Sequence, residues 1–242
     1  MAQYPNLYLP NNLQLKMNLA PYIDHTILKP GLLLSEVAKV CSEAVEYGFA
    51  AVCIPPMMVK PAINYLKQLK ATHLPKVATV IGFPFGYAAI EAKLAETVLA
   101  IVDGADELDV VINYTAIKNN DWQLVANEIN HMMPIITNKN KVVKVIIESG
   151  MLTNDEIIKC CDLYGAAGVH FIKTSTGYAE KGASVEAVAL IRKHVSDAVQ
   201  IKASGGIRDY EFAKALVEAG ATRLGCSSSI AIVKGGAAQG NY

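Results

Sequence analysis

The chain has 242 residues, 52% of them hydrophobic, so it can bury a large core and lies in the size range where an α/β barrel forms one domain. Its 22 basic residues equal its 22 acidic residues in number, which argues against nucleic acid or an anionic membrane as a partner. Because there is no signal-peptide pattern, no apolar run near the roughly 20 residues of a spanning helix and no disulfide spacing among the five cysteines, we expect a cytoplasmic protein with reduced thiols and no membrane partner.

Short apolar runs recur along the chain after an irregular, polar N-terminal extension. Residues 1–20 form this extension, with one short helix expected near residues 11–17. The eight apolar runs that follow have the length of buried strands: Ile23–Thr26, Phe49–Ile54, Val77–Ile81, Glu107–Ile112, Val142–Ile147, Val169–Ile172, Val199–Ala203 and Arg223–Cys226. Residues 234–242 are rich in glycine, which predicts a flexible tail.

Helix-like segments separate the strands. They span Ser35–Tyr47, Met57–Leu69, Ala88–Val102, Asp121–Ile136, Thr153–Tyr164, Ser184–His194 and Tyr210–Ala219. Thr153 and Glu156 have the spacing of a capping box, and a glycine at positions 48, 104, 165 and 220 is expected to end a helix.

The alternation of strands and helices determines the expected fold class. Nearly continuous apolar strands indicate a parallel sheet that is covered on both faces. Eight such units in about 240 residues predict an α/β protein, a (β/α)₈ TIM barrel that forms a single domain over residues 1–242. No glycine-rich dinucleotide fingerprint follows the first strand, which counts against a Rossmann fold.

Several charged residues fall at strand positions that point into the barrel. Side chains along a strand point alternately into the barrel and toward the helices. If Lys173 points inward, this alternation also indicates which side chains of the other strands point inward. It brings Asp109, Lys144, Lys173 and Lys202 to the interior, and from the first strand it brings either Asp24 or His25, of which we favour Asp24. Buried charges are costly, so this cluster indicates either a catalytic centre or a structural ion-pair network such as Asp109 with Lys144.

Lys173 and Lys202 occupy matched positions at the ends of consecutive strands. Burial disfavours an ammonium ion, and a second cation nearby lowers the pKa further, which yields a free amine that can attack a carbonyl. Two matched lysines therefore predict Schiff-base chemistry, in which an iminium stabilises a carbanion. Asp109 is the candidate for proton transfer, with assistance from Lys202.

The last two strands lead into short loops of small residues. The segments Ser204–Ile207 and Gly225–Ser229 follow strands seven and eight, and the second continues into an apolar helical turn. Backbone N–H groups in such loops suit a phosphate, and this is the usual phosphate position of the barrel.

Together these segments resemble the deoxyribose-phosphate aldolase family. The matching motifs occur in the family's order: Tyr22–Pro30, Gly82–Gly86, Gly104–Val111, Lys144–Glu148, Phe171–Gly177, Ser204–Ile207 and Arg223–Ser228. The resemblance implies a class I aldolase, without a metal or other cofactor, that reversibly cleaves 2-deoxy-D-ribose 5-phosphate to acetaldehyde and D-glyceraldehyde 3-phosphate in deoxyribose phosphate catabolism. By motif position Lys173 forms the Schiff base, Lys202 depresses its pKa and Asp109 carries the proton. The phosphate-binding residues implied are Gly205, Gly206, Gly225, Ser227 and Ser228, while Asp24 and Lys144 form a supporting polar network.

Two positions depart from the pattern or add to it. Cys226 stands where the family commonly has Thr or Ala, and Glu180 lies in a loop where it repels a phosphate unless Lys181 or distance screens it. Tyr242 ends the flexible tail, and we expect it to close over the site as a lid.

Other interpretations stay open at this point. Another phosphosugar barrel, an isomerase or a decarboxylase, needs the phosphate loops but no nucleophilic lysine, and a non-catalytic phosphosugar-binding module needs only the pocket. Metal-dependent aldol chemistry is a further alternative, but the five histidines show no ligand spacing. We expect small phosphosugar and aldehyde substrates, and a homo-oligomer, a dimer or larger.

Overall fold

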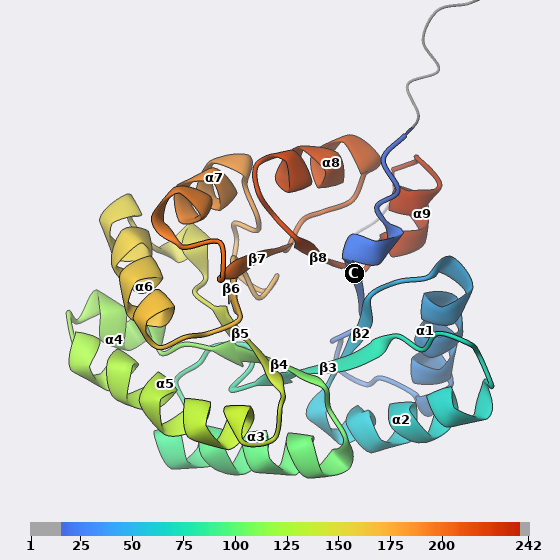
Figure 1. Ribbon diagram of the computed structural model, residues 1–242, viewed down its shortest axis with the longest axis horizontal. Helices are drawn as coiled ribbons and strands as arrows, with labels where there is room; N and C mark the ends of the chain where they lie inside the picture. Colours follow the sequence, from blue (N-terminus) through green and yellow to red (C-terminus); the bar gives the residue numbers. More distant parts are fainter. Residues whose placement is uncertain (1–15, 238–242) are drawn as a thin grey trace, which may run out of the picture.

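The computed structural model describes residues 16–237, and in them eight parallel strands close into a barrel. Each strand pairs with the next along the chain, and β8 pairs with β1 (Figure 1). The strands are β1 (Ile23–Thr26), β2 (Ala51–Ile54), β3 (Lys76–Ile81), β4 (Glu107–Val111), β5 (Val142–Ile146), β6 (Phe171–Lys173), β7 (Gln200–Ser204) and β8 (Arg223–Cys226). The predicted TIM barrel is confirmed.

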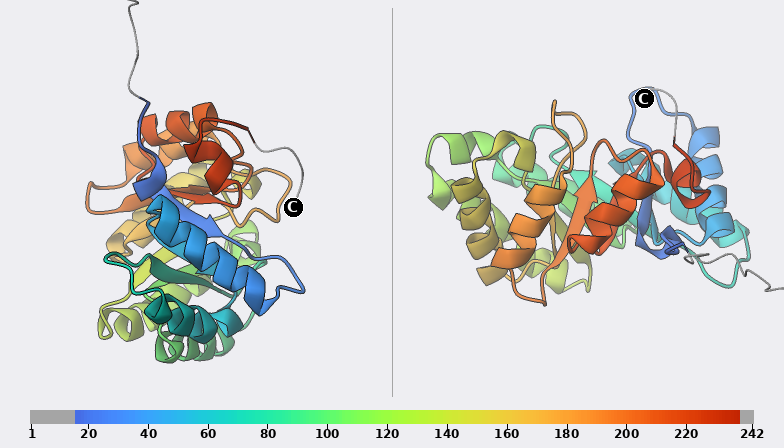
Figure 2. Two further views of the ribbon diagram at one scale, coloured as in Figure 1. Left: turned by 90° about the vertical axis from the view of Figure 1, so that its right-hand side faces the viewer. Right: turned by 90° about the horizontal axis from the view of Figure 1, so that it is seen from above.

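Helices surround the barrel on its outside (Figures 1 and 2). They are α1 (Leu34–Tyr47), α2 (Val59–Gln68), α3 (Ile90–Asp103), α4 (Tyr114–Lys118), α5 (Trp122–Thr137), α6 (Asn154–Ala166), α7 (Val185–His194), α8 (Tyr210–Glu218) and α9 (Ser229–Val233). The described residues also contain three short 3₁₀ helices, η1 (Ala20–Tyr22), η2 (Pro56–Met58) and η3 (Ser149–Met151). No helix among the described residues is long and apolar enough to span a membrane.

Local sequence signals explain most helix ends. The capping box of α6 is present, because the Thr153 hydroxyl accepts from Glu156 N at 3.3 Å while the Glu156 carboxylate accepts from Thr153 N at 2.7 Å. Gly48 and Gly104 end α1 and α3 as predicted. The prediction for Gly165 is wrong, because α6 continues to Ala166.

The boundaries of other elements also differ from the predictions. Strand β6 begins at Phe171 rather than at Val169, and α4 and the 3₁₀ helices were not predicted. These pieces are too short to show a helical repeat in the sequence. The helix expected near residues 11–17 falls mainly outside the described residues.

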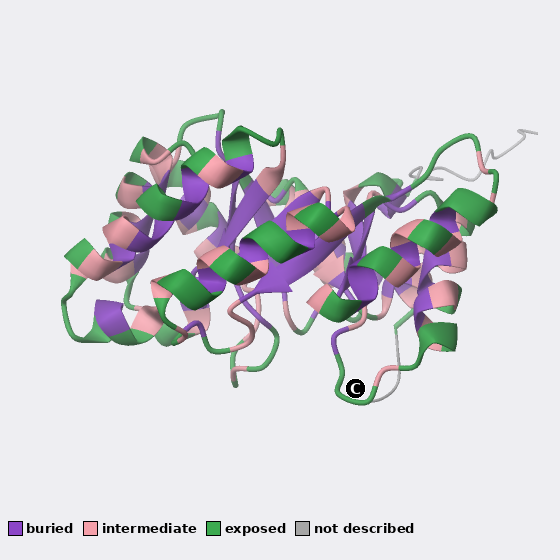
Figure 3. Cartoon of the chain, turned by 90° about the horizontal axis from the view of Figure 1, so that it is seen from below, coloured by how far each residue is buried: buried purple, intermediate pink, exposed green. Residues whose placement is uncertain are grey.

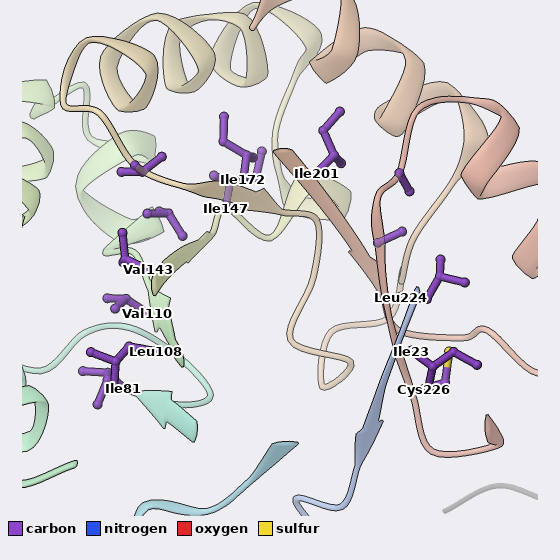
Figure 4. Close-up of a cluster of buried hydrophobic side chains, with 14 of the residues drawn as sticks. Ile23, Ile81, Leu108, Val110, Val143, Ile147, Ile172, Ile201, Leu224 and Cys226 are labelled. Atoms are coloured by element: carbon purple, nitrogen blue, oxygen red, sulfur yellow. The ribbon is translucent and has the colours of Figure 1, made fainter. Parts of the chain in front are cut away.

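The larger core lies between the barrel and its helices. Alternate strand residues point outward into this layer, where they are buried together with the inner faces of the helices (Figures 3 and 4). Members include Ile23, Leu108, Val110, Val143, Ile172 and Ile201. Because side chains alternate, Asp24, Asp109, Lys144, Lys173 and Lys202 are left for the barrel interior, as predicted.

Candidate active site

Lys173 and Lys202 meet at one carboxylate inside the barrel. The two lysines are register partners on β6 and β7. The Nζ atoms of both donate to Asp109 Oδ2, each at 2.7 Å, and the other oxygen, Oδ1, accepts from Lys144 Nζ at 2.8 Å. All four side chains are buried. The three residues that the sequence places at the centre of the chemistry are therefore in direct contact.

A second layer of charges lies beneath this centre. Asp24 accepts a short hydrogen bond from Lys202 and another from Arg223 Nη1 at 2.7 Å. Glu107 lies 2.6 Å from Lys144 Nζ and 3.1 Å from Arg223 Nη1. Asp24 and Lys144 are thus in direct contact with the central residues, Asp24 with Lys202 and Lys144 with Asp109. The sequence interpretation missed Glu107 and Arg223, although Glu107 shares the strand phase of Asp109.

The network contains more cations than anions. Its members are three carboxylates and four basic groups: Asp24, Glu107 and Asp109 with Lys144, Lys173, Lys202 and Arg223. If every group is ionised, the cluster holds an excess positive charge on side chains that are mostly buried. Releasing one proton from one amine removes this excess.

The pKa shifts indicate which amine gives up its proton. Burial lowers the pKa of Lys173; Asp109 opposes this effect, and the Lys202 cation adds to it. For Lys202, burial is outweighed by Asp109 and Asp24, which raise its pKa. Burial also lowers the pKa of Lys144, but Asp109, Asp24 and Glu107 together outweigh this effect and raise it. Among the three lysines, the neutral amine is therefore favoured at Lys173.

Asp109 keeps its negative charge despite its burial. Burial disfavours the carboxylate, but the neighbouring Lys144, Lys173 and Lys202 hold the pKa of Asp109 well below its usual range. In the free protein Asp109 is consequently a hydrogen-bond acceptor for three amines.

A cavity of about 100 Å³ leads from Lys173 to the loops after β7 and β8. All five predicted phosphate-binding residues line it: Gly205, Gly206, Gly225, Ser227 and Ser228. Gly205 has a φ of 89° and Gly206 a φ of 77°, a backbone conformation that side chains other than glycine disfavour. The cavity has further lining residues that the sequence interpretation did not select, among them Thr26, Leu28, Thr176 and Arg208.

Glu148 anchors the loop that carries Thr176. The Glu148 carboxylate accepts from Thr176 N at 3.2 Å and from the Thr176 hydroxyl at 2.5 Å. Glu148 itself adopts a left-handed backbone conformation with a φ of 51°. Glu180 does not line the cavity beside the phosphate loops; it borders a neighbouring one together with Glu148. Its side chain is therefore not part of the predicted phosphate position.

The opposite wall of the barrel interior is apolar. A small cluster of Leu28, Ala51, Cys53, Ala78 and Val80 packs there against Phe83. The Tyr178 ring meets the Phe83 ring edge to face at 5.2 Å, and the Tyr178 hydroxyl donates to Leu28 O at 2.9 Å. Lys173 thus lies between a charged wall and an apolar wall.

Two other predictions concern the tail and a metal. Tyr242, the predicted lid, lies outside the described residues. Within residues 16–237, no three side chains of His, Cys, Asp or Glu gather in a way that would hold a metal ion.

Comparison with known proteins finds one consistent set of relatives. A model described as "DeoC/LacD family aldolase" matches residues 19–239. The deoxyribose-phosphate aldolase of Thermococcus gammatolerans is 49% identical over 219 residues, which cover 90% of this chain and 96% of the relative. The enzyme of the same name from Thermococcus kodakarensis is 48% identical over 220 residues, which cover 91% and 97%.

Solved structures agree with this result. The tetrameric deoxyribose phosphate aldolase from Aeropyrum pernix matches with a TM-score of 0.82 at 31% identity, over 89% of each chain. A protein described as QR15, an aldolase, matches with a TM-score of 0.83 at 38% identity, over 90% of this chain and 95% of its own.

Proposed function

The chain belongs to the DeoC/LacD family of aldolases, and from this premise we propose that it cleaves 2-deoxy-D-ribose 5-phosphate through a Schiff base on Lys173. It is a lyase with the activity of a deoxyribose-phosphate aldolase. The proposed products are acetaldehyde and D-glyceraldehyde 3-phosphate, formed reversibly and without a cofactor.

The observation that carries the mechanism is the difference among the three buried lysines. Lys173 has a lowered pKa and borders the cavity, whereas Lys202 and Lys144 have raised pKa values. Its amine attacks the substrate aldehyde at C1, and loss of water yields an iminium. The iminium takes up the electron pair when the bond between C2 and C3 breaks, which leaves an enamine on Lys173.

Asp109 and Lys202 are proposed to move the protons. As a carboxylate, Asp109 can accept the proton that the C3 hydroxyl loses on cleavage, directly or through one water. Lys202 donates to the same oxygen of Asp109 and can pass a proton along this hydrogen bond to the enamine carbon. Water then hydrolyses the iminium, which releases acetaldehyde and restores the amine.

The loops after β7 and β8 are proposed to hold the phosphate. Gly205, Gly206, Gly225, Ser227 and Ser228 line the end of the cavity away from the barrel centre, and Arg208 lies beside them. Backbone N–H groups and serine hydroxyls donate to phosphate oxygens, and the guanidinium balances the charge. Asp24 and Lys144 are proposed to support the network without touching substrate.

Trapping the Schiff base tests this mechanism. The protein is incubated with acetaldehyde and borohydride, and the reduced adduct is mapped by peptide mass spectrometry. We expect an ethyl group on Lys173, no specific adduct in Lys173→Met, and normal labelling in the surface variant Lys214→Met. An adduct on Lys202, or none in the native protein, would show that the roles of the lysines are wrongly assigned. A phosphosugar isomerase, a decarboxylase or a binding module would also give no adduct.

We further propose a cytoplasmic homo-oligomer. The five cysteines are all free and buried, which fits a reducing compartment. Helix α3 exposes Val98, Leu99 and Val102 on its outer face, and Leu99 is 63% and Val102 76% exposed. An apolar stripe of this kind is typical of a helix that packs against a second copy of the chain.

A further inference from the structure

A buried histidine connects helix α1 to the loop that follows β8. His25 follows Asp24 on β1 and points the opposite way, out of the barrel and toward the helices. Its Nε2 lies 2.8 Å from Glu43 Oε2 on α1, and its Nδ1 lies 2.9 Å from the hydroxyl of Ser229, the first residue of α9. Both helices lie on the same side of the barrel (Figure 1). Nothing in the proposed aldol chemistry uses these three side chains.

Ser229 lies directly after the two serines of the proposed phosphate site. Its hydroxyl donates at 2.9 Å to the carbonyl oxygen of Cys226, at the other end of the same turn. Cys226 is also the register partner of His25 between β8 and β1. His25 and Ser229 therefore hold both ends of the turn that presents Ser227 and Ser228.

The hydrogen-bond directions depend on the protons of the imidazole ring. The Cys226 carbonyl only accepts, so the single hydroxyl proton of Ser229 goes to it, and His25 Nδ1 must then donate to the Ser229 oxygen. A carboxylate also only accepts, so Nε2 donates to Glu43. All three hydrogen bonds exist together only when the ring carries both protons.

Loss of one ring proton changes the turn. The charge-assisted bond from Nε2 to Glu43 is the stronger one and is kept. Nδ1 of His25 then becomes an acceptor. The Ser229 hydroxyl rotates away from the Cys226 carbonyl and donates to Nδ1 instead. The turn loses its internal tether without any change in the side chains that would touch the substrate.

We propose that His25, oriented by Glu43, is a positioning residue for the substrate phosphate that acts through Ser229 on the turn from Cys226 to Ser228. The inference rests on the phosphate position of the proposed function. It predicts tighter phosphate binding when the ring is doubly protonated, so that binding weakens as the pH rises through the pKa of His25.

The surroundings of the ring decide where this titration falls. Burial lowers the pKa of His25, and Glu43 opposes the effect. The other groups that face the ring are Lys39 on α1, whose Nζ lies 3.8 Å from Glu43 and whose charge lowers the pKa, the backbone of Cys226 on β8, which raises the pKa as a hydrogen-bond partner, and the Phe49 ring, which packs against the imidazole with a centroid distance of 5.2 Å.

The test compares two substrates that differ only in the phosphate. Ser229→Ala, which removes one oxygen, and His25→Gln are assayed with 2-deoxyribose 5-phosphate and with 2-deoxyribose. We expect KM for the phosphorylated sugar to rise about tenfold in each, in line with the loss of one hydrogen-bonded tether. The kcat for this sugar and kcat/KM for 2-deoxyribose should stay unchanged, and the double variant should be no worse than either single one.

A matched control and the pH profile complete the test. Ser42→Ala also removes a hydroxyl on α1 from a partly buried hydrogen bond, but its partner is Tyr65 and not His25, so it should leave both KM values unchanged. The rise in KM with pH should be weaker in His25→Gln than in the native protein and should move to lower pH in Glu43→Gln. The substrate phosphate titrates equally in every variant.

Three outcomes would overturn the proposal: unchanged KM for the phosphorylated sugar, an equal loss for both sugars, or identical pH profiles. Failure of the proposed function looks different, because acetaldehyde trapping on Lys173 would then fail in the native protein as well. If His25→Gln does not fold, Ser229→Ala and the comparison of the pH profiles of the native protein and Glu43→Gln still decide the question.

Discussion

A buried ion pair behind the active site provides the sharpest test of the fold. Lys93 on α3 donates to Glu128 Oε2 on α5 at 2.6 Å and to Val111 O at 2.7 Å. The Lys93 side chain is 0% exposed and that of Glu128 5%. Val111 ends β4, two residues beyond Asp109, so the pair also fixes the strand that carries the proposed proton acceptor.

Removing only the lysine should be severe. Lys93→Met leaves the carboxylate of Glu128 buried without its cation and leaves the Val111 carbonyl without this donor. Breaking a buried pair in this way costs about 3–5 kcal/mol. For a chain of this size each kcal/mol lowers Tm by about 2–4 °C, so we expect a fall of roughly 10 °C in a calorimetric scan at pH 8.

The pH dependence of this loss has a definite sign. Burial raises the pKa of Glu128, and Lys93 opposes that effect in the native protein. Without Lys93 the carboxyl pKa in the folded state lies further above its unfolded value. The penalty is therefore complete above the folded pKa and absent below the unfolded pKa. The deficit of Lys93→Met should shrink as the pH falls from 8 toward 5.

A double variant and a surface control distinguish pairing from other causes. Replacing both partners, as Lys93→Met with Glu128→Leu, removes both charges and should recover about 2 kcal/mol relative to the sum of the single changes. Lys214→Met breaks a surface bridge to Glu218 of 3.4 Å and should cost less than about 1 kcal/mol. Equal losses in Lys93→Met and Lys214→Met, or strict additivity in the double variant, would refute the reasoning.

The remaining predictions concern catalysis, the loop after β3 and assembly. Asp109→Asn replaces a carboxylate that can take up a proton with a neutral amide that cannot, so turnover of 2-deoxyribose 5-phosphate should fall about 10²–10⁴-fold; a loss below tenfold would contradict its role in proton transfer. Gly86→Ala places a Cβ 1.9 Å from Ile112 O at a φ of 70°, so the variant should melt well below the native protein and express poorly, and a native Tm would contradict this. Leu99→Glu on α3 should reduce the mass measured by light scattering to that of a single chain while the monomer stays folded; an unchanged mass would show that the copies associate elsewhere or not at all.

The sequence alone determined the repeating architecture and which charged side chains were candidates for the chemistry. Apolar runs separated by helical periods allow only a parallel sheet covered by helices, and eight of them fit a closed barrel. With Lys173 taken to point inward, strand alternation then assigned Asp109 and Lys144 to the interior as well. These inferences succeed because the direction of a side chain on a strand depends only on its position along that strand.

Tertiary structure decided how those side chains act on one another. Barrel closure brings Arg223 to Asp24 and Glu107, and it places Lys173 and Lys202 on one oxygen of Asp109. The lowering of the pKa at Lys173 and its rise at Lys202 follow from this arrangement, because a pKa depends on burial and on charges summed through space. His25 and Ser229 are 204 positions apart in the sequence, and only the pairing of β1 with β8 makes them neighbours.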